Sequence, residues 1–346
     1  MRAVVYRGPR HVELVARAAP RLQGPRDALV RVTRSAICGT DLHPYRGELA
    51  GFRPDTVLGH EFVGVVAETG SEVDLPLGTR VVASDVVACG RCASCARGWH
   101  YQCDQVGLFG YSDVVGRPLD GGQAELVRVP FADTVLSVCP DELSDEQMLF
   151  VGDVLSTGYA AAAATRITPG DVVGVVGAGP VGLLSALCLR LCGAALVVLA
   201  DPEARRRTAA RSLGLEATTP TELPAVLQAA AGGSGARAVV EAVGSAAALD
   251  CAIDAAGQHA TVVVVGAPST EPPPLAVQRA FANELTLRFV VGDPIRDGER
   301  VTALVRAGLL DPTVVVSHRL PLTDAVEAYQ LFDRREAVKV IMVHED

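Results

Sequence analysis

Residues 172–201 read "VVGVVGAGPVGLLSALCLRLCGAALVVLAD", and this stretch decides the fold class. Its β-branched start predicts a buried strand, the apolar middle predicts a helix ending at Gly193, and residues 195–201 predict a second strand. The turn between the first strand and the helix is "GAGPVG", at residues 177–182. Alone, a G-x-G-x-x-G spacing can be a plain glycine turn, but this flanking context favours dinucleotide binding.

Each glycine of the motif has a predicted task. Gly177 permits the tight turn, and Gly179 lets a pyrophosphate approach the free N–H groups at the helix N-terminus. Gly182 allows the helix to pack close to the sheet. Pro180 and Val181, which lie inside the motif, complete this part of the predicted cofactor-binding set.

Asp201 ends the second strand, at the spacing expected for the acid that binds the adenosine ribose. Its carboxylate would bind both ribose hydroxyls and repel a 2′-phosphate, which favours NAD over NADP. Three arginines follow at residues 205–207, so use of NADP stays open.

The rest of the chain falls into two kinds of segment. Short β-branched runs broken by glycine and proline fill the first 150 residues, for example at 28–34 and 62–70. An alanine-rich helix is expected at 157–165, and strands and helices then alternate, with further strands at 236–244 and 259–266. This pattern indicates an α/β fold with a doubly wound parallel Rossmann sheet, beside a β-rich domain. We expect the boundaries near 150 and 290, with the tail returning to the first domain.

Composition narrows the class of protein. The 346 residues carry a net charge of −9, with 49% hydrophobic and 21% charged residues. These values are typical of a globular chain, and the acidic balance argues against a nucleic-acid partner. No uncharged apolar run of about 18 residues predicts a membrane span, and residues 1–15 do not read as a secretory signal. We therefore expect a cytoplasmic protein without a membrane partner.

Residues 89–103 read "CGRCASCARGWHYQC" and contain four of the nine cysteines. In a reducing compartment such a cluster is more often a metal site than a pair of disulfides. Zinc held by four thiolates has no open position, so the pattern predicts a structural zinc site. A nucleic-acid zinc finger is the weaker alternative, because fingers pair their ligands across a longer loop beside a basic helix. The predicted ligands are Cys89, Cys92, Cys95 and Cys103.

A sparser set of possible zinc ligands lies in "ICGTDLHPYRG" at 37–47, "LGHEFVG" at 58–64 and "GDVLSTGY" at 152–159. A catalytic zinc takes three protein ligands and keeps one position open. Cys38, His60 and Asp153 would supply a thiolate, an imidazole and a carboxylate, and Glu61 is a further residue of a ligand type. The alternative for any one of them alone is a core residue without a metal.

Together these motifs resemble the medium-chain zinc-dependent alcohol dehydrogenases, over nearly the whole chain. The resemblance rests on "CGTDLH", "GHE", the four-cysteine stretch, "GAGPVG" and the ending "HRLPLTDAVEAYQLFDRREAVKV". "GDVLSTGY" and "GGQAELVRVPFAD" are similar to the formaldehyde-dehydrogenase-like branch. The resemblance implies a GroES-like catalytic domain over 1–150, a Rossmann domain over 151–290 and a C-terminal return over 291–346.

The resemblance also implies roles around the catalytic zinc. Cys38, His60 and Asp153 match the three zinc ligands. Glu61 matches a conditional ligand that approaches the metal when water exchanges. Asp41 matches the partner that orients the histidine ligand, and the four clustered cysteines match a separate structural zinc site.

Beyond the metal, the resemblance implies a proton path and two cofactor contacts. Thr40 matches the hydroxyl that takes the substrate proton, and His43 matches the outer end of the relay. Thr157 matches a contact to the nicotinamide, and Lys339 matches a basic residue near the cofactor phosphates.

The implied reaction is the reversible oxidation of a primary or secondary alcohol to an aldehyde or ketone by hydride transfer to NAD. Two zinc ions per chain and a homodimer or homotetramer are expected with it, and copies could pair through a strand at 285–292. One alternative is a polyol, aminocyclitol or specialised-metabolite dehydrogenase, and another is a non-catalytic NAD-binding redox sensor or scaffold. The residues considered for pocket walls are Tyr45, Phe62, Leu108, Phe109 and Leu155.

Overall fold

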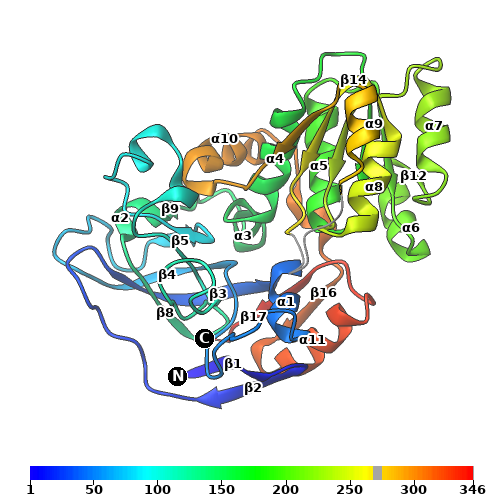
Figure 1. Cartoon of the computed structure of the whole chain (residues 1–346). Coiled ribbons are helices and arrows are strands. Elements are labelled where there is room, and N and C mark those ends of the chain that lie inside the picture. The colour runs from blue at the N-terminus through cyan, green and yellow to red at the C-terminus, as the bar shows by residue number, and fades with distance from the viewer. Residues whose placement is uncertain (268–274, 346) are drawn as a thin grey trace. The chain divides into compact units, whose positions relative to one another are not determined.

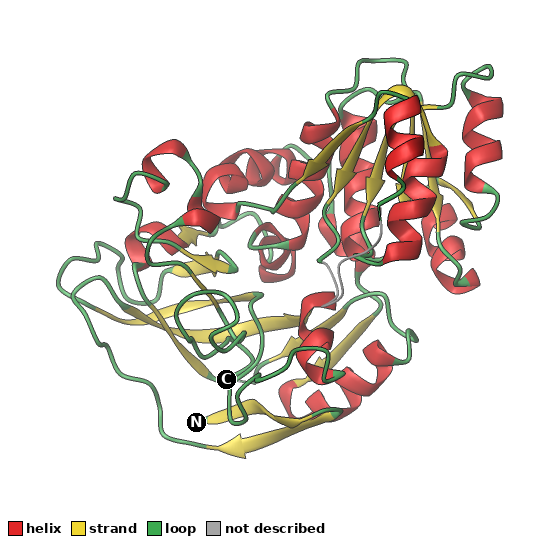
Figure 2. Cartoon of the chain, in the orientation of Figure 1, coloured by secondary structure: helices red, strands yellow, loops and turns green. Residues whose placement is uncertain are grey.

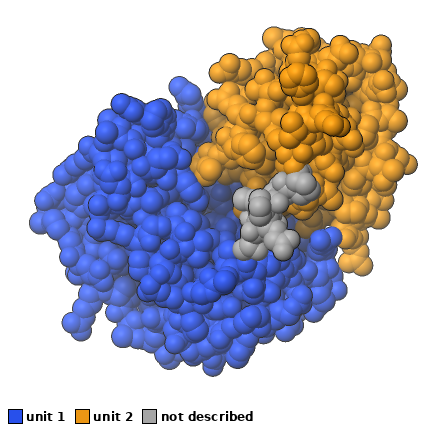
Figure 3. Space-filling view, viewed as in Figure 1, with its two compact units in different colours: residues 1–156, 293–346 blue, residues 157–292 orange. Residues whose placement is uncertain are grey.

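The computed structural model describes residues 1–267 and 275–345. It divides into two compact units: unit 1 comprises residues 1–156 and 293–346, and unit 2 comprises residues 157–292 (Figure 3). The sequence places its changes of texture near 150 and 290, so Asp153 falls on the dinucleotide-binding side of the expected boundary. In the structure Asp153 belongs to unit 1, together with the N-terminal residues and the tail.

Unit 2 is built on a six-stranded parallel sheet with the order β12-β11-β10-β13-β14-β15. Figure 1 labels two of its strands, β12 and β14. Strand β10 (Val172–Val176) lies in the middle, and the chain extends the sheet first on one side and then on the other. This reversal beside β10 is the switch point where doubly wound folds bind their ligands. The predicted Rossmann sheet is confirmed. Its other strands are β11 (Leu196–Ala200), β12 (Glu216–Thr218), β13 (Ala236–Glu241), β14 (Ala256–Val264) and β15 (Thr286–Phe289).

Helices pack on the strands of this sheet (Figure 2). Both faces of β10 and β11 are covered, which explains why these strands are almost continuously apolar and buried. Helix α5 (Pro180–Leu191) starts with proline at its first position, where no intrahelical N–H bond is lost. The other helices are α4 (Val154–Thr165), which begins in unit 1, α6 (Ala204–Ser212), α7 (Leu223–Ala230), α8 (Ala246–Ala255) and α9 (Val277–Ala282).

Unit 1 contains a seven-stranded sheet, in which β16, β17, β3, β4, β5 and β9 follow one another and β8 pairs with β3. The long strand β3 (Ala28–Ile37) runs antiparallel to β4 (Phe62–Thr69), with Ser35 opposite Phe62. On its other side β3 pairs with β17 (Val340–Val343), with Ile37 opposite Val340. Residues that follow β3, precede β4 and precede β17 therefore lie side by side.

Most of the remaining elements of unit 1 are short, and α10 (Pro294–Arg306) is the longest of them. Hydrophobic side chains gather in two main clusters, one around Tyr329 and one around Phe62 and Phe109. The strands are β1 (Arg2–Gly8), β2 (His11–Ala16), β5 (Arg80–Ala83), β6 (Val86–Val87), β7 (Gly107–Leu108), β8 (Leu126–Val129), β9 (Leu136–Val138) and β16 (His318–Pro321). The α-helices are α1 (Leu42–Tyr45), α2 (Ala132–Val135), α3 (Asp145–Val151), α10 (Pro294–Arg306) and α11 (Ala325–Asp333). The 3-10 helices include η1 (Gly39–Asp41), η2 (Cys95–Arg97) and η3 (His100–Gln102).

Within the described residues, no single helix is long and apolar enough to cross a membrane. Helices α3 and α4 reach that length and composition only as a pair, across a bend of 47°.

Candidate metal centres and cofactor site

Three segments of unit 1 bring four possible metal ligands together. Cys38 follows β3, His60 and Glu61 precede β4, and Asp153 precedes α4. The β3–β4 register explains the first approach, because it places residues just beyond one strand beside those just before the other. One ligand atom from each of the four residues lies within 4.8 Å of the others, and all four side chains are buried. The structure thus gathers the set that the sequence singled out.

Carboxylates fix the orientation of these donors. Asp153 Oδ2 lies 3.3 Å from His60 Nε2 and 3.6 Å from Cys38 Sγ. Behind the ring, His60 Nδ1 lies 3.2 Å from Asp41 Oδ1. Asp41 Oδ2 accepts a hydrogen bond of 2.9 Å from the backbone N–H of Cys38. Asp41 therefore positions the ring and the cysteine backbone at once, as the carboxylate behind a metal-binding histidine does.

Glu61 has a buried cation beside it. Lys339 Nζ lies 2.6 Å from Glu61 Oε1 and 2.5 Å from Oε2, and neither side chain is exposed. The pairing follows from the sheet, because Lys339 directly precedes β17 and β17 lies beside β3. This placement makes Lys339 the counter-ion of Glu61. A contact between Lys339 and cofactor phosphates receives no support from it and stays a prediction.

The protonation preferences of this cluster are those of a site that suits a cation. Burial raises the pKa of the Cys38 thiol to about 11, and the charges of Asp153 and Glu61 add to the effect. Burial also raises the pKa of Glu61 to about 7, against the opposing charge of Lys339. Thiolate, imidazole and carboxylate are the ligand types that zinc takes, and a bound metal ion keeps such groups deprotonated. The donor set therefore fits zinc.

The pKa values of His60 and Asp153 shift in the directions expected for a histidine and a carboxylate in contact. Burial by itself lowers the pKa of His60, but the carboxylate of Asp41 and other anionic neighbours raise it well above its usual value. Burial by itself raises the pKa of Asp153, but the hydrogen bond and the charge of His60 lower it below its usual value. The two groups thus attract the same positive charge, which a proton or a metal ion can supply.

The sulfur atoms of the four-cysteine lobe, residues 89–103, form a second cluster. Sulfur separations are 3.5 Å for Cys92–Cys95, 3.9 Å for Cys92–Cys103 and 4.0 Å for Cys89–Cys95. Four sulfurs at about 2.3 Å from zinc stand roughly 3.8 Å apart at tetrahedral angles, whereas a disulfide needs about 2.05 Å. Backbone N–H groups, that of Cys95 first, lower the pKa of Cys92 to about 6, which favours a thiolate. These residues fit a closed zinc site.

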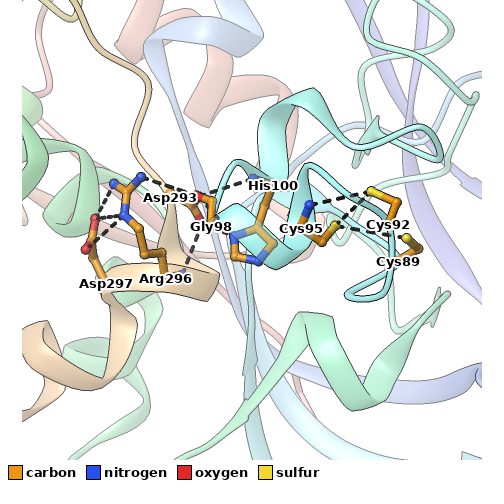
Figure 4. Close-up of polar contacts among 8 residues, drawn as sticks. All are labelled: Cys89, Cys92, Cys95, Gly98, His100, Asp293, Arg296 and Asp297. Atoms are coloured by element: carbon orange, nitrogen blue, oxygen red, sulfur yellow. Dashed lines mark hydrogen bonds and ion pairs between the residues drawn. The ribbon is translucent and has the colours of Figure 1, made fainter.

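The four-cysteine lobe is tied to the start of α10 (Figure 4). His100 Nδ1 donates to Asp293 Oδ1 at 2.9 Å, and Asp293 caps α10 by accepting from the backbone N–H of Arg296 at 3.1 Å. Arg296 reaches back to the carbonyl of Gly98 at 3.4 Å. A lobe folded around zinc therefore also holds the first turn of α10.

The residues of the predicted proton relay lie in the turn after β3. Thr40 Oγ1 lies 3.9 Å from Cys38 Sγ, in η1. His43 is half-buried in α1, and its Nδ1 lies 2.6 Å from Glu48 Oε2. The carboxylate of Glu48 therefore fixes the orientation of the His43 ring.

The glycine motif of unit 2 is open to a ligand at one residue and closed at the others. Gly177 has a φ of 101°, which glycine adopts without strain. A Cβ at Gly182 would lie 1.9 Å from the carbonyl oxygen of Gly177, so only glycine keeps α5 against the turn. A Cβ at Gly179 would meet one guanidinium nitrogen of Arg206 at 4.0 Å and nothing nearer. The backbone at the N-terminus of α5 can therefore receive a phosphate.

Asp201 borders the same turn. Its Oδ2 accepts a hydrogen bond of 2.9 Å from the backbone N–H of Ala178, and Oδ1 accepts one of 2.9 Å from Glu203. Arg206 Nη1 lies 3.5 Å from Asp201 Oδ2. A buried acid beside the motif suits the ribose of NAD, and the arginine next to it is a group that a 2′-phosphate would meet.

Other predicted residues have plain positions. Pro180 and Val181 form the first turn of α5, and Thr157 is the first residue of unit 2, within α4. The pocket-wall prediction needs correction, because Phe62 and Phe109 are fully buried and their rings meet edge to face at 5.1 Å in the core. Phe62 begins β4, whose first three residues are all buried, and Phe109 directly follows β7. Also fully or almost fully buried are Tyr45, Leu108 and Leu155.

Three polar residues near the metal clusters lie outside every motif. Glu48 holds His43, Asp293 anchors the four-cysteine lobe, and Asp85 is buried between β5 and β6. Only Asp293 carries a signal in the sequence, as an N-cap residue followed by a proline.

A four-donor cluster that suits catalytic zinc, a closed four-thiolate site and a glycine-opened helix on a Rossmann sheet define a class, the zinc-binding dinucleotide-dependent dehydrogenases. Comparison with known families agrees. Residues 24–141 match the family described as the alcohol dehydrogenase GroES-like domain, and residues 180–306 match the family described as zinc-binding dehydrogenase.

Individual relatives extend the match over the whole chain. A probable zinc-binding alcohol dehydrogenase of Mycobacterium tuberculosis is 35% identical over 332 residues, which is 95% of this chain and 84% of that protein. The structure of the alcohol dehydrogenase TADH from Thermus sp. ATN1 matches with a TM-score of 0.94 and 38% identity, covering 100% of both chains. An Escherichia coli alcohol dehydrogenase solved with NADH matches with a TM-score of 0.87 and 26% identity, covering 99% of both chains.

This chain belongs to the medium-chain zinc-dependent alcohol dehydrogenase family. It is an oxidoreductase acting on CH–OH groups. Assignment to the formaldehyde-dehydrogenase-like branch stays a prediction.

Proposed function

We propose that this protein oxidises a primary or secondary alcohol reversibly to an aldehyde or ketone, with NAD as hydride acceptor. The observation that carries the proposal is the gathering of Cys38, His60, Glu61 and Asp153 within 4.8 Å. The first, second and fourth of these are the proposed ligands of the catalytic zinc. The carbinol carbon gives a hydride to the nicotinamide, and the hydroxyl gives up a proton.

Zinc, when bound, lowers the pKa of a hydroxyl, as it lowers that of water from 15.7 to about 7. The chain itself handles the proton. Thr40, whose hydroxyl lies 3.9 Å from Cys38 Sγ, takes it from the alcohol and passes its own hydroxyl proton on toward the cofactor ribose and His43. His43 passes it to solvent, since its ring is half-buried and held on one side by Glu48. Thr157 is proposed to contact the nicotinamide.

Glu61 is proposed to act as a conditional metal ligand. Its carboxylate lies within the cluster and is also paired with Lys339. Approach to the metal would therefore require Glu61 to loosen its ion pair with Lys339. This competition supports an assignment in which Asp153 is the resident third ligand and Glu61 serves only during exchange.

The four cysteines of the lobe are proposed to hold a structural zinc. Four thiolates would fill all four positions of a tetrahedral zinc ion, which would leave none for an alcohol. The contacts from His100 and Arg296 support a purely mechanical role, since they connect the lobe to α10.

NAD is proposed as the cofactor, bound by Gly177, Gly179, Gly182 and Asp201, with Pro180 and Val181 at the helix start. The open backbone at Gly179 supports the placement of the pyrophosphate. The buried carboxylate of Asp201 supports NAD over NADP.

A homo-oligomer is proposed, with a second copy of this chain pairing at β15. Strand β15 is the last strand at one edge of the unit 2 sheet, and an open edge can pair with another strand. Phe289 on β15 is 73% exposed and Phe281 on α9 is 84% exposed, which supports burial of this edge. The prediction of a cytoplasmic protein is supported by nine cysteines that are all free within the described residues.

The proposal is tested by metal analysis and turnover together. Wild-type protein should contain two zinc ions per chain and reduce NAD with at least one alcohol. Cys38→Ala should contain one zinc and lose turnover while keeping its fold and its affinity for NADH. Cys139→Ala is the matched control, because Cys139 is buried in unit 1 outside both clusters. A Cys38→Ala protein with two zinc ions and normal turnover would refute the assignment, and one zinc in an inactive wild type would favour the scaffold alternative.

A further inference from the structure

Asp85 is a buried acid that the reaction described above does not use. It lies in the connection between β5 and β6 and is 8% exposed. Among the described residues, no donor forms a hydrogen bond with its Oδ1 atom, which is itself buried. A carboxylate oxygen without a partner in such a place is costly, so a native protein retains one where it has a use.

The backbone holds Asp85 next to the catalytic cluster. Its N–H donates to the carbonyl of Gly152 at 2.9 Å, and Gly152 directly precedes the proposed ligand Asp153. Its carbonyl accepts from the N–H of Phe109 at 3.3 Å, and the Phe109 ring packs on Phe62, two residues beyond His60. Asp85 is therefore fixed from two sides by segments that also place metal ligands.

A tyrosine approaches from the four-cysteine lobe. Tyr101 lies in η3, and η3 contacts β6, the strand that directly follows Asp85. The neighbouring residue His100 is bonded to Asp293, which holds this part of the lobe in place (Figure 4). Tyr101 therefore belongs to a segment of the lobe that packs beside the connection containing Asp85.

The charge around Asp85 is mainly negative. Burial raises its pKa well above the usual value, and the charges of Asp153 and Asp293 add to this, against the opposing charge of His60. Such an oxygen gains from any neutral hydrogen-bond donor, whereas a negatively charged ligand group would be repelled.

We propose that Asp85 is a specificity-determining residue that accepts a hydrogen bond from a second hydroxyl of the substrate, so that the enzyme selects diols or polyols over simple alcohols. This inference rests on the proposed alcohol dehydrogenase function. A site that pairs with a substrate hydroxyl discriminates strongly against the analogue that lacks it, because the buried group is then left unpaired.

The test compares alcohols of one carbon skeleton. Initial rates with NAD give kcat/KM for 1-butanol and for 1,2-, 1,3- and 1,4-butanediol, and 2-amino-1-butanol probes an ammonium donor instead of a hydroxyl. The wild type should prefer at least one diol over 1-butanol. In Asp85→Ala this preference should fall on the order of 10-fold, the worth of one hydrogen bond. Asp85→Asn, which keeps one acceptor oxygen, should fall between the two.

The control and the fold are measured alongside. Asp27 is also a buried acid of unit 1, but its Oδ2 accepts from Gln23, Gly24 and Arg128, so Asp27→Asn should leave the diol preference unchanged. Thermal unfolding and zinc content show that each variant is intact. If Asp85→Ala does not fold, Asp85→Asn decides.

The results that would contradict the role of Asp85 differ from those that would contradict the proposed function. Equal diol preference in the wild type and in the Asp85 variants would overturn the role of Asp85 while leaving the alcohol dehydrogenase function standing. A wild-type preference confined to 2-amino-1-butanol would overturn the assignment to a hydroxyl. A wild type that oxidises no alcohol and reduces no aldehyde or ketone would refute the proposed function and this inference with it.

Discussion

The substitution Gly179→Ala tests cofactor binding independently of the stability of the fold. The backbone there has φ −77° and ψ −177°, which any residue adopts. The added Cβ would find its nearest neighbour, Arg206 Nη1, at 4.0 Å. Stability of Gly179→Ala should therefore change by less than about 1 kcal/mol, in either direction. If a pyrophosphate rests on this backbone, the same methyl takes its place, and the dissociation constant for NADH should rise roughly 10-fold or more.

Alanine substitutions at two other glycines serve as comparison variants. Gly182→Ala would place a Cβ 1.9 Å from a backbone oxygen, so it should cost about 1–3 kcal/mol of folding free energy as well as cofactor affinity. Gly298→Ala, inside α10, meets nothing nearer than Val151 at 3.8 Å and should gain about 0.5–1 kcal/mol with NADH binding unchanged. The assays are thermal unfolding and titration of NADH fluorescence. A stable Gly179→Ala protein that binds NADH as tightly as the wild type would refute the placement of the cofactor.

Three further predictions concern unit 1. Cys95→Ser should lower the zinc content from two to one per chain and lower the unfolding temperature, while the folded fraction keeps its turnover; a fully stable but inactive variant would show that the two metal roles are reversed. Lys339→Met leaves Glu61 without its ion pair and should destabilise the protein by about 3–5 kcal/mol in chemical unfolding, and Glu61→Gln in the same chain should recover part of that loss. Burial lowers the pKa of His344 to about 4 from 6.5, so the unfolded chain binds a proton that the folded chain refuses. Stability should fall by about 3 kcal/mol as the pH drops from 6.5 to 4, and an unchanged pH profile in His344→Gln would contradict this.

Local patterns were enough to predict the fold class of unit 2 and its first strand, turn and helix. The strand, turn and helix of residues 172–191 match β10 and α5 because apolar period, glycine spacing and a proline at the helix start all agree. The metal site of the four-cysteine lobe could also be predicted, because its donors lie within fifteen residues and only their spacing matters.

Contacts between distant segments could not be predicted from the sequence. Lys339 and Glu61 are 278 residues apart, and only the pairing of β17 with β3 brings them together. Asp85 follows a short strand in no motif, and its burial depends on backbone bonds to Gly152 and Phe109. Residue type alone also misplaced Phe62 and Phe109, because the sequence does not show which aromatic rings pack against each other in the core.

Selective removal of one metal tests the central claim most directly. We propose that catalysis depends on the zinc at Cys38, His60 and Asp153, and that the zinc of the four-cysteine lobe only supports the fold. Dialysis against a chelator, followed by zinc analysis, circular dichroism and alcohol oxidation on the same sample, should yield folded protein with one zinc per chain and no turnover. Turnover should return when one equivalent of zinc is restored. Full turnover in the one-zinc protein would contradict the account.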